Sequence, residues 1–100
     1  MSKAQVASKS TFWVVGKKYF IRTVTMYQTG ELVSIEGPND SELVLKDAAW
    51  VACTKRFADS LRTGEFEEVE PYPDGELVLV NRSAVIDAYP WKHELPRTQK

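Results

Sequence analysis

The chain has 100 residues, enough for one domain with a modest hydrophobic core. Hydrophobic residues make up 43% of it and the net charge is −1, a combination that argues against wholesale disorder. No apolar run approaches the roughly 18 residues of a membrane helix. The stretch from Met1 to Thr11 is polar and has no signal-peptide core. We therefore expect a cytoplasmic protein with no membrane partner.

Cysteine and histidine are too scarce for most site chemistry. Cys53 is the only cysteine and His93 the only histidine, which excludes an internal disulfide and a multi-cysteine zinc site. Cys53 lies in an apolar stretch and His93 in the tail, so a nucleophile–base pair is not expected. Gly16-Lys17-Lys18 lacks the upstream glycine of a phosphate-binding loop. We expect no enzyme, no metal and no cofactor.

Charge is unevenly distributed along the chain. Residues 1–30 carry five basic residues and no acid, whereas residues 31–76 carry twelve acids against four basic residues. Residues 77–100 carry four basic residues against two acids. A nearly neutral protein of this kind can present one basic face to an anionic partner. The alternative interpretation is scattered, solvated charge.

Five short strands are predicted after a loose N-terminal arm at residues 1–11. The strand segments are rich in β-branched and aromatic residues: 19–28, 31–35, 43–46, 77–80 and 84–89. Turn residues separate them: 29–30, 37–40, 71–75 and 81–83.

One short helix is predicted over residues 55–63, between the third and fourth strands. Thr54 can cap its start and Gly64 can end it. Its apolar face is formed by Phe57, Ala58 and Leu61. The helix lies in a long connection, residues 49–76, and residues 91–100 form an irregular tail. Short sequential strands joined by turns favour a mainly β, five-stranded small barrel, with residues 1–100 as a single domain.

Two of the predicted strands are apolar on both alternating faces. These are residues 43–45 (Leu-Val-Leu) and residues 77–80 (Leu-Val-Leu-Val). A small closed barrel has one inner face, so the outer face requires another cover. The inserted helix is one candidate cover and a neighbouring subunit is the other.

The segments 30–35 (GELVSI) and 43–48 (LVLKDA) resemble the first motif of the Sm/LSm family, and residues 80–85 (VNRSAV) resemble the second. Val24 and Met26 stand where the first strand of that family has inward residues. The resemblance covers about half of the chain and is strongest to the bacterial host-factor-like proteins and their marine viral, cyanophage-like branch. It implies an Sm-like (SH3-like) barrel in the cytoplasm of a bacterial or phage-infected cell.

The resemblance also implies an assembly and a ligand. Sm-like proteins form homo-oligomeric rings of about five to seven subunits by pairing the fourth strand of one subunit with the fifth of the next. Such rings bind single-stranded RNA, or DNA, at loops around a central pore. At the matching loops this chain has amide, hydroxyl, carboxylate and guanidinium groups: Asn39, Asp40, Ser41, Asn81, Arg82 and Ser83.

Arg82 is the leading candidate, as a ligand for phosphate or a platform for a base. Lys17 and Lys18 are a second basic site on a ring face. Each has a structural alternative: Arg82 could be a turn residue paired with an acid such as Asp87, and the lysines could be solvated at a strand start over core aromatics.

This sequence also departs from the family pattern. The loop before the third strand is about two residues longer than usual, and no glycine follows Arg82. A structural or protein-interaction ring that binds no nucleic acid is therefore the alternative function, and a monomeric barrel adaptor is a weaker one.

Overall fold

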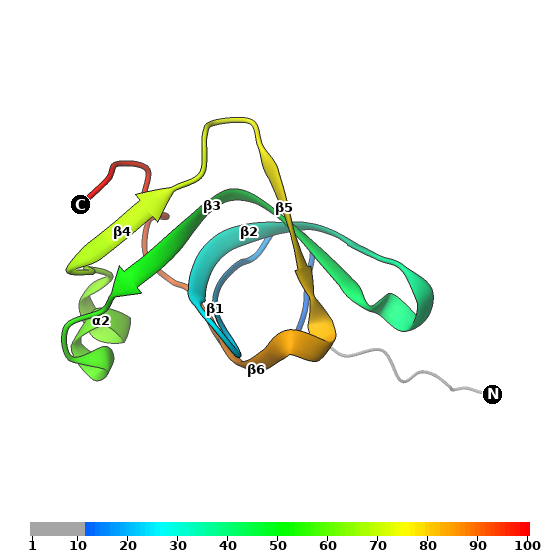
Figure 1. Ribbon diagram of the computed structural model, residues 1–100, viewed down its shortest axis with the longest axis horizontal. Coiled ribbons are helices and arrows are strands. Elements are labelled where there is room, and N and C mark those ends of the chain that lie inside the picture. Colours follow the sequence, from blue (N-terminus) through cyan, green and yellow to red (C-terminus); the bar gives the residue numbers. More distant parts are fainter. Residues whose placement is uncertain (1–11) are drawn as a thin grey trace.

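Residues 12–100 form a mainly β fold, as predicted, with six antiparallel strands rather than five. We describe residues 12–100 of a computed structural model (Figure 1). The strands are β1 Lys18–Thr23, β2 Tyr27–Glu36, β3 Glu42–Cys53, β4 Glu68–Pro71, β5 Leu77–Asn81 and β6 Val85–Pro90. The connections between them contain the α-helix α2 Phe57–Thr63 and the 3-10 turns η1 Pro38–Asp40 and η2 Arg82–Ala84. The predicted arm at residues 1–11 lies outside the described residues.

Strand β3 organises the sheet because its two halves pair with different strands. The strand order is β4-β3-β2-β1-β6, and β5 pairs with β3 away from this path. Lys46 is the last β3 residue opposite β5, and Ala49 is the first opposite β4. Between them Asp47 has a φ of 51°, which interrupts the extended conformation. Figure 1 shows the result: β4 and α2 lie at one end, and the tip carrying η1 lies at the other.

The first hairpin turns earlier than predicted. The expected strand over residues 19–28 ends at Thr23, and the Thr23 hydroxyl both donates to the Met26 carbonyl and accepts from the Met26 amide. Val24 is 73% exposed in this turn and Met26 is only half-buried, so neither is an inward strand residue. Gly30, predicted as a turn residue, lies inside β2 instead. A Cβ there would lie 3.0 Å from Leu45 Cβ, so close strand packing explains this glycine.

The predicted 49–76 connection contains two strand segments. Residues 49–53 continue β3, and β4 follows the helix at Glu68–Pro71. Phe66 and Val69 are buried among exposed glutamates. The acidic composition concealed this edge strand because Val69 is its one buried side chain and both of its glutamates are exposed.

Helix α2 begins two residues later than predicted. Lys55 has a φ of 73°, and the Thr54 hydroxyl donates to the Lys55 carbonyl instead of accepting from a helix amide. Arg56 occupies the N-cap position without a side-chain cap bond. Gly64 ends the helix in the left-handed conformation, as predicted. The expected apolar face is only partly buried: Leu61 packs on the core, Phe57 and Ala58 are exposed, and Ser60 is fully buried.

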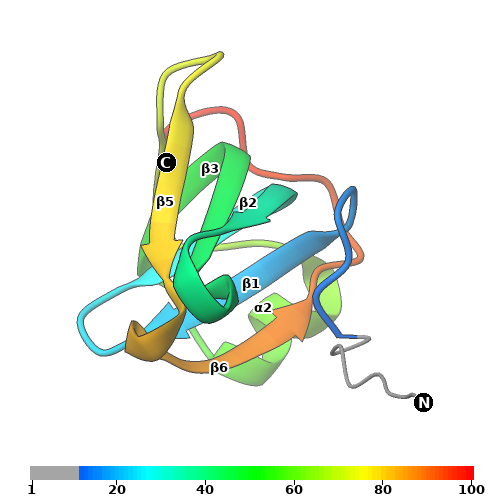
Figure 2. The ribbon, with the colours of Figure 1, turned by 90° about the vertical axis from the view of Figure 1, so that its right-hand side faces the viewer.

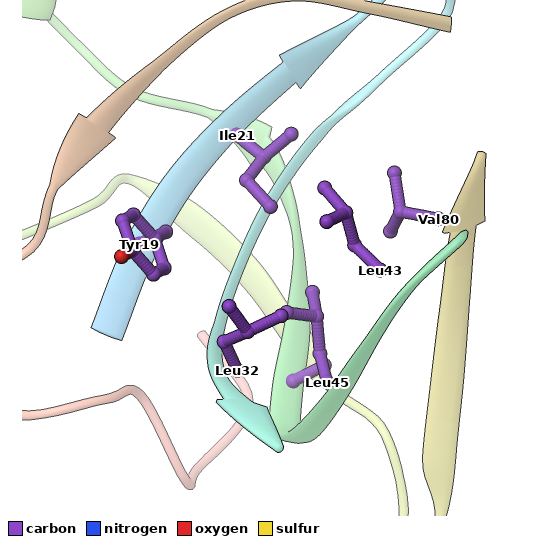
Figure 3. Packing of buried hydrophobic residues seen from close by; sticks show 7 residues of the cluster. Tyr19, Ile21, Leu32, Leu43, Leu45 and Val80 are labelled. Carbon is purple, nitrogen blue, oxygen red and sulfur yellow. The ribbon is translucent and has the colours of Figure 1, made fainter. Parts of the chain in front are cut away.

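Both faces of β1 are buried, each against its own cluster. Figure 3 shows the first cluster, which contains Tyr19, Ile21, Leu32, Leu43, Leu45, Ala48 and Val80. The second lies against Phe20, where Phe20, Phe66 and Trp91 stack with ring centroids 5.2–5.8 Å apart. Side chains alternate along a strand, so one strand serves two cores.

The tail has no helix or strand, as predicted, but it is packed against the sheet. Trp91 is buried in the second cluster. Lys100 and Val69 exchange two backbone hydrogen bonds, 2.9 and 3.2 Å long, along the outer edge of β4. Within residues 12–100, no helix is long and apolar enough to cross a membrane.

Candidate nucleic-acid interface

The turn between β5 and β6 is held by Asn81. Its Oδ1 accepts hydrogen bonds from the Ser83 backbone amide at 2.9 Å and from the Ser83 hydroxyl at 2.7 Å. This is N-cap chemistry at the start of η2. Ordinary turn chemistry therefore engages Asn81 Oδ1 and the Ser83 hydroxyl. Both residues are nonetheless exposed, and no described residue bonds the side-chain amide nitrogen, Nδ2, of Asn81.

A backbone hydrogen bond joins this turn to the other predicted loop. The Arg82 amide donates to the Ser41 carbonyl at 2.8 Å, and Ser41 directly follows η1. This hydrogen bond follows from the register of β3 and β5, because Glu42 at the start of β3 stands opposite Asn81 at the end of β5. Six of the eight predicted binding residues thus form two adjoining turns, seen in Figure 2 where β5 leads into β6.

Asn39 and Asp40 give the first of these turns its shape. Both have left-handed backbones, with φ of 56° and 55°, and both are exposed. Asn and Asp adopt this conformation more readily than other non-glycine residues. Their side chains make no hydrogen bond or ion pair with any other residue in the described part of the chain.

Arg82 differs from most other arginines of the chain in its electrostatics. Arg22, Arg62 and Arg97 each form an ion pair with a carboxylate. Arg82 forms none with any residue of 12–100; it is half-buried, and its Nε is shielded without a hydrogen-bond partner. A half-buried cation with no internal counter-charge favours an external anion.

The expected alternative partner of Arg82, Asp87, is engaged elsewhere. Asp87 stands opposite Arg22 across β1 and β6, and Arg22 Nε donates to its carboxylate at 3.1 Å. Hydrogen bonds from Arg22 lower the pKa of Asp87, and the same pair raises the pKa of Arg22. The Arg82–Asp87 interpretation is wrong for this reason.

Lys17 and Lys18 lie at the opposite end of β1 from the two turns. Tyr19, next to Lys18, stands opposite Pro90, whereas Thr23 at the other end stands opposite Val85 beside η2. Lys18 Nζ donates to the His93 carbonyl at 2.6 Å, and Lys17 is exposed. The lysines therefore do not belong to the surface around Arg82.

Strands β5 and β6 expose large apolar side chains. Leu77 and Leu79 on β5 are 64% and 54% exposed, and Ile86 on β6 is 56% exposed. Within the described chain β5 pairs only with β3, and β6 only with β1. The two strands predicted to be apolar on both faces therefore differ in burial. Residues 43–45 are buried by the chain itself, whereas residues 77–79 are not.

Cys53 and His93 have separate partners. The Cys53 thiol lies 3.3 Å from Glu67 Oε1, and His93 Nε2 lies 2.8 Å from the Leu61 carbonyl. Among residues 12–100, no three His, Cys, Asp or Glu side chains gather as metal ligands.

Comparison of the chain with protein-family models, with curated proteins and with solved structures gave no match.

Proposed function

We propose that this protein is a ring-forming Sm-like protein that binds single-stranded RNA, or single-stranded DNA, at the turns around Arg82. The observation that carries the proposal is the exposed apolar surface of Leu77, Leu79 and Ile86 on two strands that each have an unpaired edge. The proposal rests further on the motif resemblance and on the junction of the two turns.

The strand connectivity is compatible with a small barrel. The continuous path β5-β3-β2-β1-β6 has β5 and β6 as its ends, and η2 joins these same two strands in the chain. A single tight turn therefore brings the two ends of the path together, which is the connectivity that a five-stranded SH3-like barrel needs. In this proposal β4 is an addition to the barrel at the far half of β3.

Ring formation would remove two unfavourable features at once. An open strand edge exposes unsatisfied backbone groups, and an exposed leucine pair exposes apolar area. Pairing β5 of one subunit with β6 of the next satisfies the backbone groups and buries both apolar surfaces. Because the contact is head-to-tail, it closes into a ring with one copy of each turn per subunit.

The turns supply the chemistry that single-stranded nucleic acid needs. The Arg82 guanidinium can bind phosphate or stack on a base, and the Asn39 and Asn81 amides can bond base edges. Repetition around a ring multiplies each weak interaction. The Asp40 carboxylate in the same turns repels phosphate. We therefore expect it to accept hydrogen bonds from base edges rather than to contact the nucleic-acid backbone.

The test is binding of fluorescein-labelled oligouridylate and oligodeoxythymidylate to the wild type and to Arg82→Ala over a series of salt concentrations. We expect Arg82→Ala to weaken binding at least about tenfold, because each subunit then has one cation fewer at the site. The slope of log affinity against log salt should become shallower by about 0.7 for each phosphate that Arg82 binds in the wild type. Arg62→Ala on α2 is the matched control and should bind like the wild type.

Unchanged affinity and salt dependence in Arg82→Ala would show that the site is assigned wrongly. An assembled ring that binds neither oligonucleotide would favour the alternative function, a structural or protein-interaction ring.

A further inference from the structure

A second surface lies on the half of β3 that pairs with β4. It is an open groove of about 350 Å³, which we name the Trp50 groove. Its lining is Met26, Trp50, Glu70, Pro71, Tyr72 and Pro73. A second hollow of about 360 Å³ shares Met26 and Trp50 and extends along the turn between β1 and β2. Most of the groove is therefore aromatic, proline or thioether surface.

The register explains why these side chains meet. Trp50 stands directly opposite Gln28 on β2 and Glu70 on β4, so all three share one face of the sheet. Gln28 is buried and its Nε2 donates to the Tyr72 hydroxyl at 3.2 Å. This bond fixes Tyr72 beside Trp50, so the groove is preformed rather than assembled by a ligand.

Two polar groups in the groove are unused. Trp50 is 40% exposed, and its indole N–H donates to no residue of 12–100. The Glu70 carboxylate has no ion pair or hydrogen bond within the same residues. Glu68 lies two residues before Glu70 on β4 and is also exposed. The groove thus combines a mainly apolar lining with one unbonded donor, the Trp50 indole, and an acidic border at Glu70.

These features define one class of occupant. The acidic border repels phosphate, which disfavours nucleic acid. Strand addition is disfavoured, because β3 is already paired with β2 on one side and β4 on the other. The outer edge of β4 is occupied at Val69 by the Lys100 backbone. A polyproline II segment needs no strand pairing, packs its rings on aromatic side chains and exposes carbonyls that an indole N–H can bind.

We propose that the Trp50 groove binds a proline-rich protein segment that carries a basic residue. The prolines lie against Trp50 and Tyr72, the indole donates to a backbone carbonyl, and Glu70 pairs with the basic side chain. The lining of the Trp50 groove includes no residue of the Arg82 turns, so the two sites are distinct.

The experiment is a titration with an oligoproline peptide that carries an arginine at each end, followed by the Trp50 indole N–H resonance. That resonance is assigned from the spectrum of Trp50→Phe. We expect a saturable shift, and about tenfold weaker binding for Trp50→Ala and for Glu70→Lys. Phe57→Ala, an aromatic of similar exposure on α2, and Glu65→Lys are the matched controls and should bind like the wild type.

Several outcomes would overturn the proposal. One is the absence of a saturable shift of the Trp50 indole, and another is equal binding by the same oligoproline with a glutamate at each end. An indole shift produced by oligouridylate instead would assign the groove to nucleic acid. A shift that depends on protein concentration alone would assign it to a second copy of this chain.

Discussion

Gly64 shows how a single residue couples the helix to the tail. It ends α2 with a φ of 81°, and a Cβ there would lie only 2.5 Å from His93 Cγ. His93 in turn bonds the Leu61 carbonyl through Nε2. The sequence predicts the left-handed glycine, because a helix that ends at glycine is common. It does not predict the proximity of His93, because the two residues belong to segments far apart in the chain.

A comparison of Gly64 with Gly75 isolates the effect of the His93 contact on the free energy of unfolding. Gly75 has a similar φ of 83°, but a Cβ there meets no atom within 4 Å. We expect Gly75→Ala to lower the free energy of unfolding by about 1 kcal/mol from backbone strain alone. Gly64→Ala should cost about 1–3 kcal/mol more, because His93 must move. Urea unfolding of both variants measures the difference, and equal decreases in stability would contradict this role of His93.

At the scale of elements, apolar strand runs were predicted more reliably than strand ends. Residues 43–46 and 77–80 lie in strands because both runs are strongly apolar and turn residues precede them. The sequence does not indicate the end of β1, because the turn residues Val24 and Thr25 are themselves typical of strands. Edge strand β4 was missed because its exposed glutamates outnumber its buried side chains. Neither error changes the two turns around Arg82.

The exposed leucines of β5 lead to a prediction for that element. We expect Leu79→Lys to keep the fold, because Leu79 is 54% exposed, and to disrupt assembly, because a charge would be buried against β6 of the next subunit. The matched control is Val15→Lys, which changes an apolar side chain of 58% exposure outside β5 and β6. Sedimentation velocity distinguishes the two. Assembly that persists in Leu79→Lys would exclude this surface as the subunit interface.

In the whole molecule, the two strongly apolar runs of the sequence lie in different environments, one buried and one exposed. The run at residues 43–45 is buried by the chain, whereas Leu77 and Leu79 remain exposed. The sequence could show that both runs needed a cover, but only the folded chain distinguishes the one already covered. A surface of this kind on a strand with an open edge is typical of a subunit interface.

The native mass in solution, measured by light scattering, distinguishes a ring from a monomer. The chain has a mass of 11.4 kDa, so a ring of about five to seven subunits predicts about 57–80 kDa. That mass should be independent of concentration over the micromolar range, because a closed ring has no free interface left. A stable monomer of 11.4 kDa would contradict the ring and, with it, the pore that places the Arg82 turns around single-stranded nucleic acid.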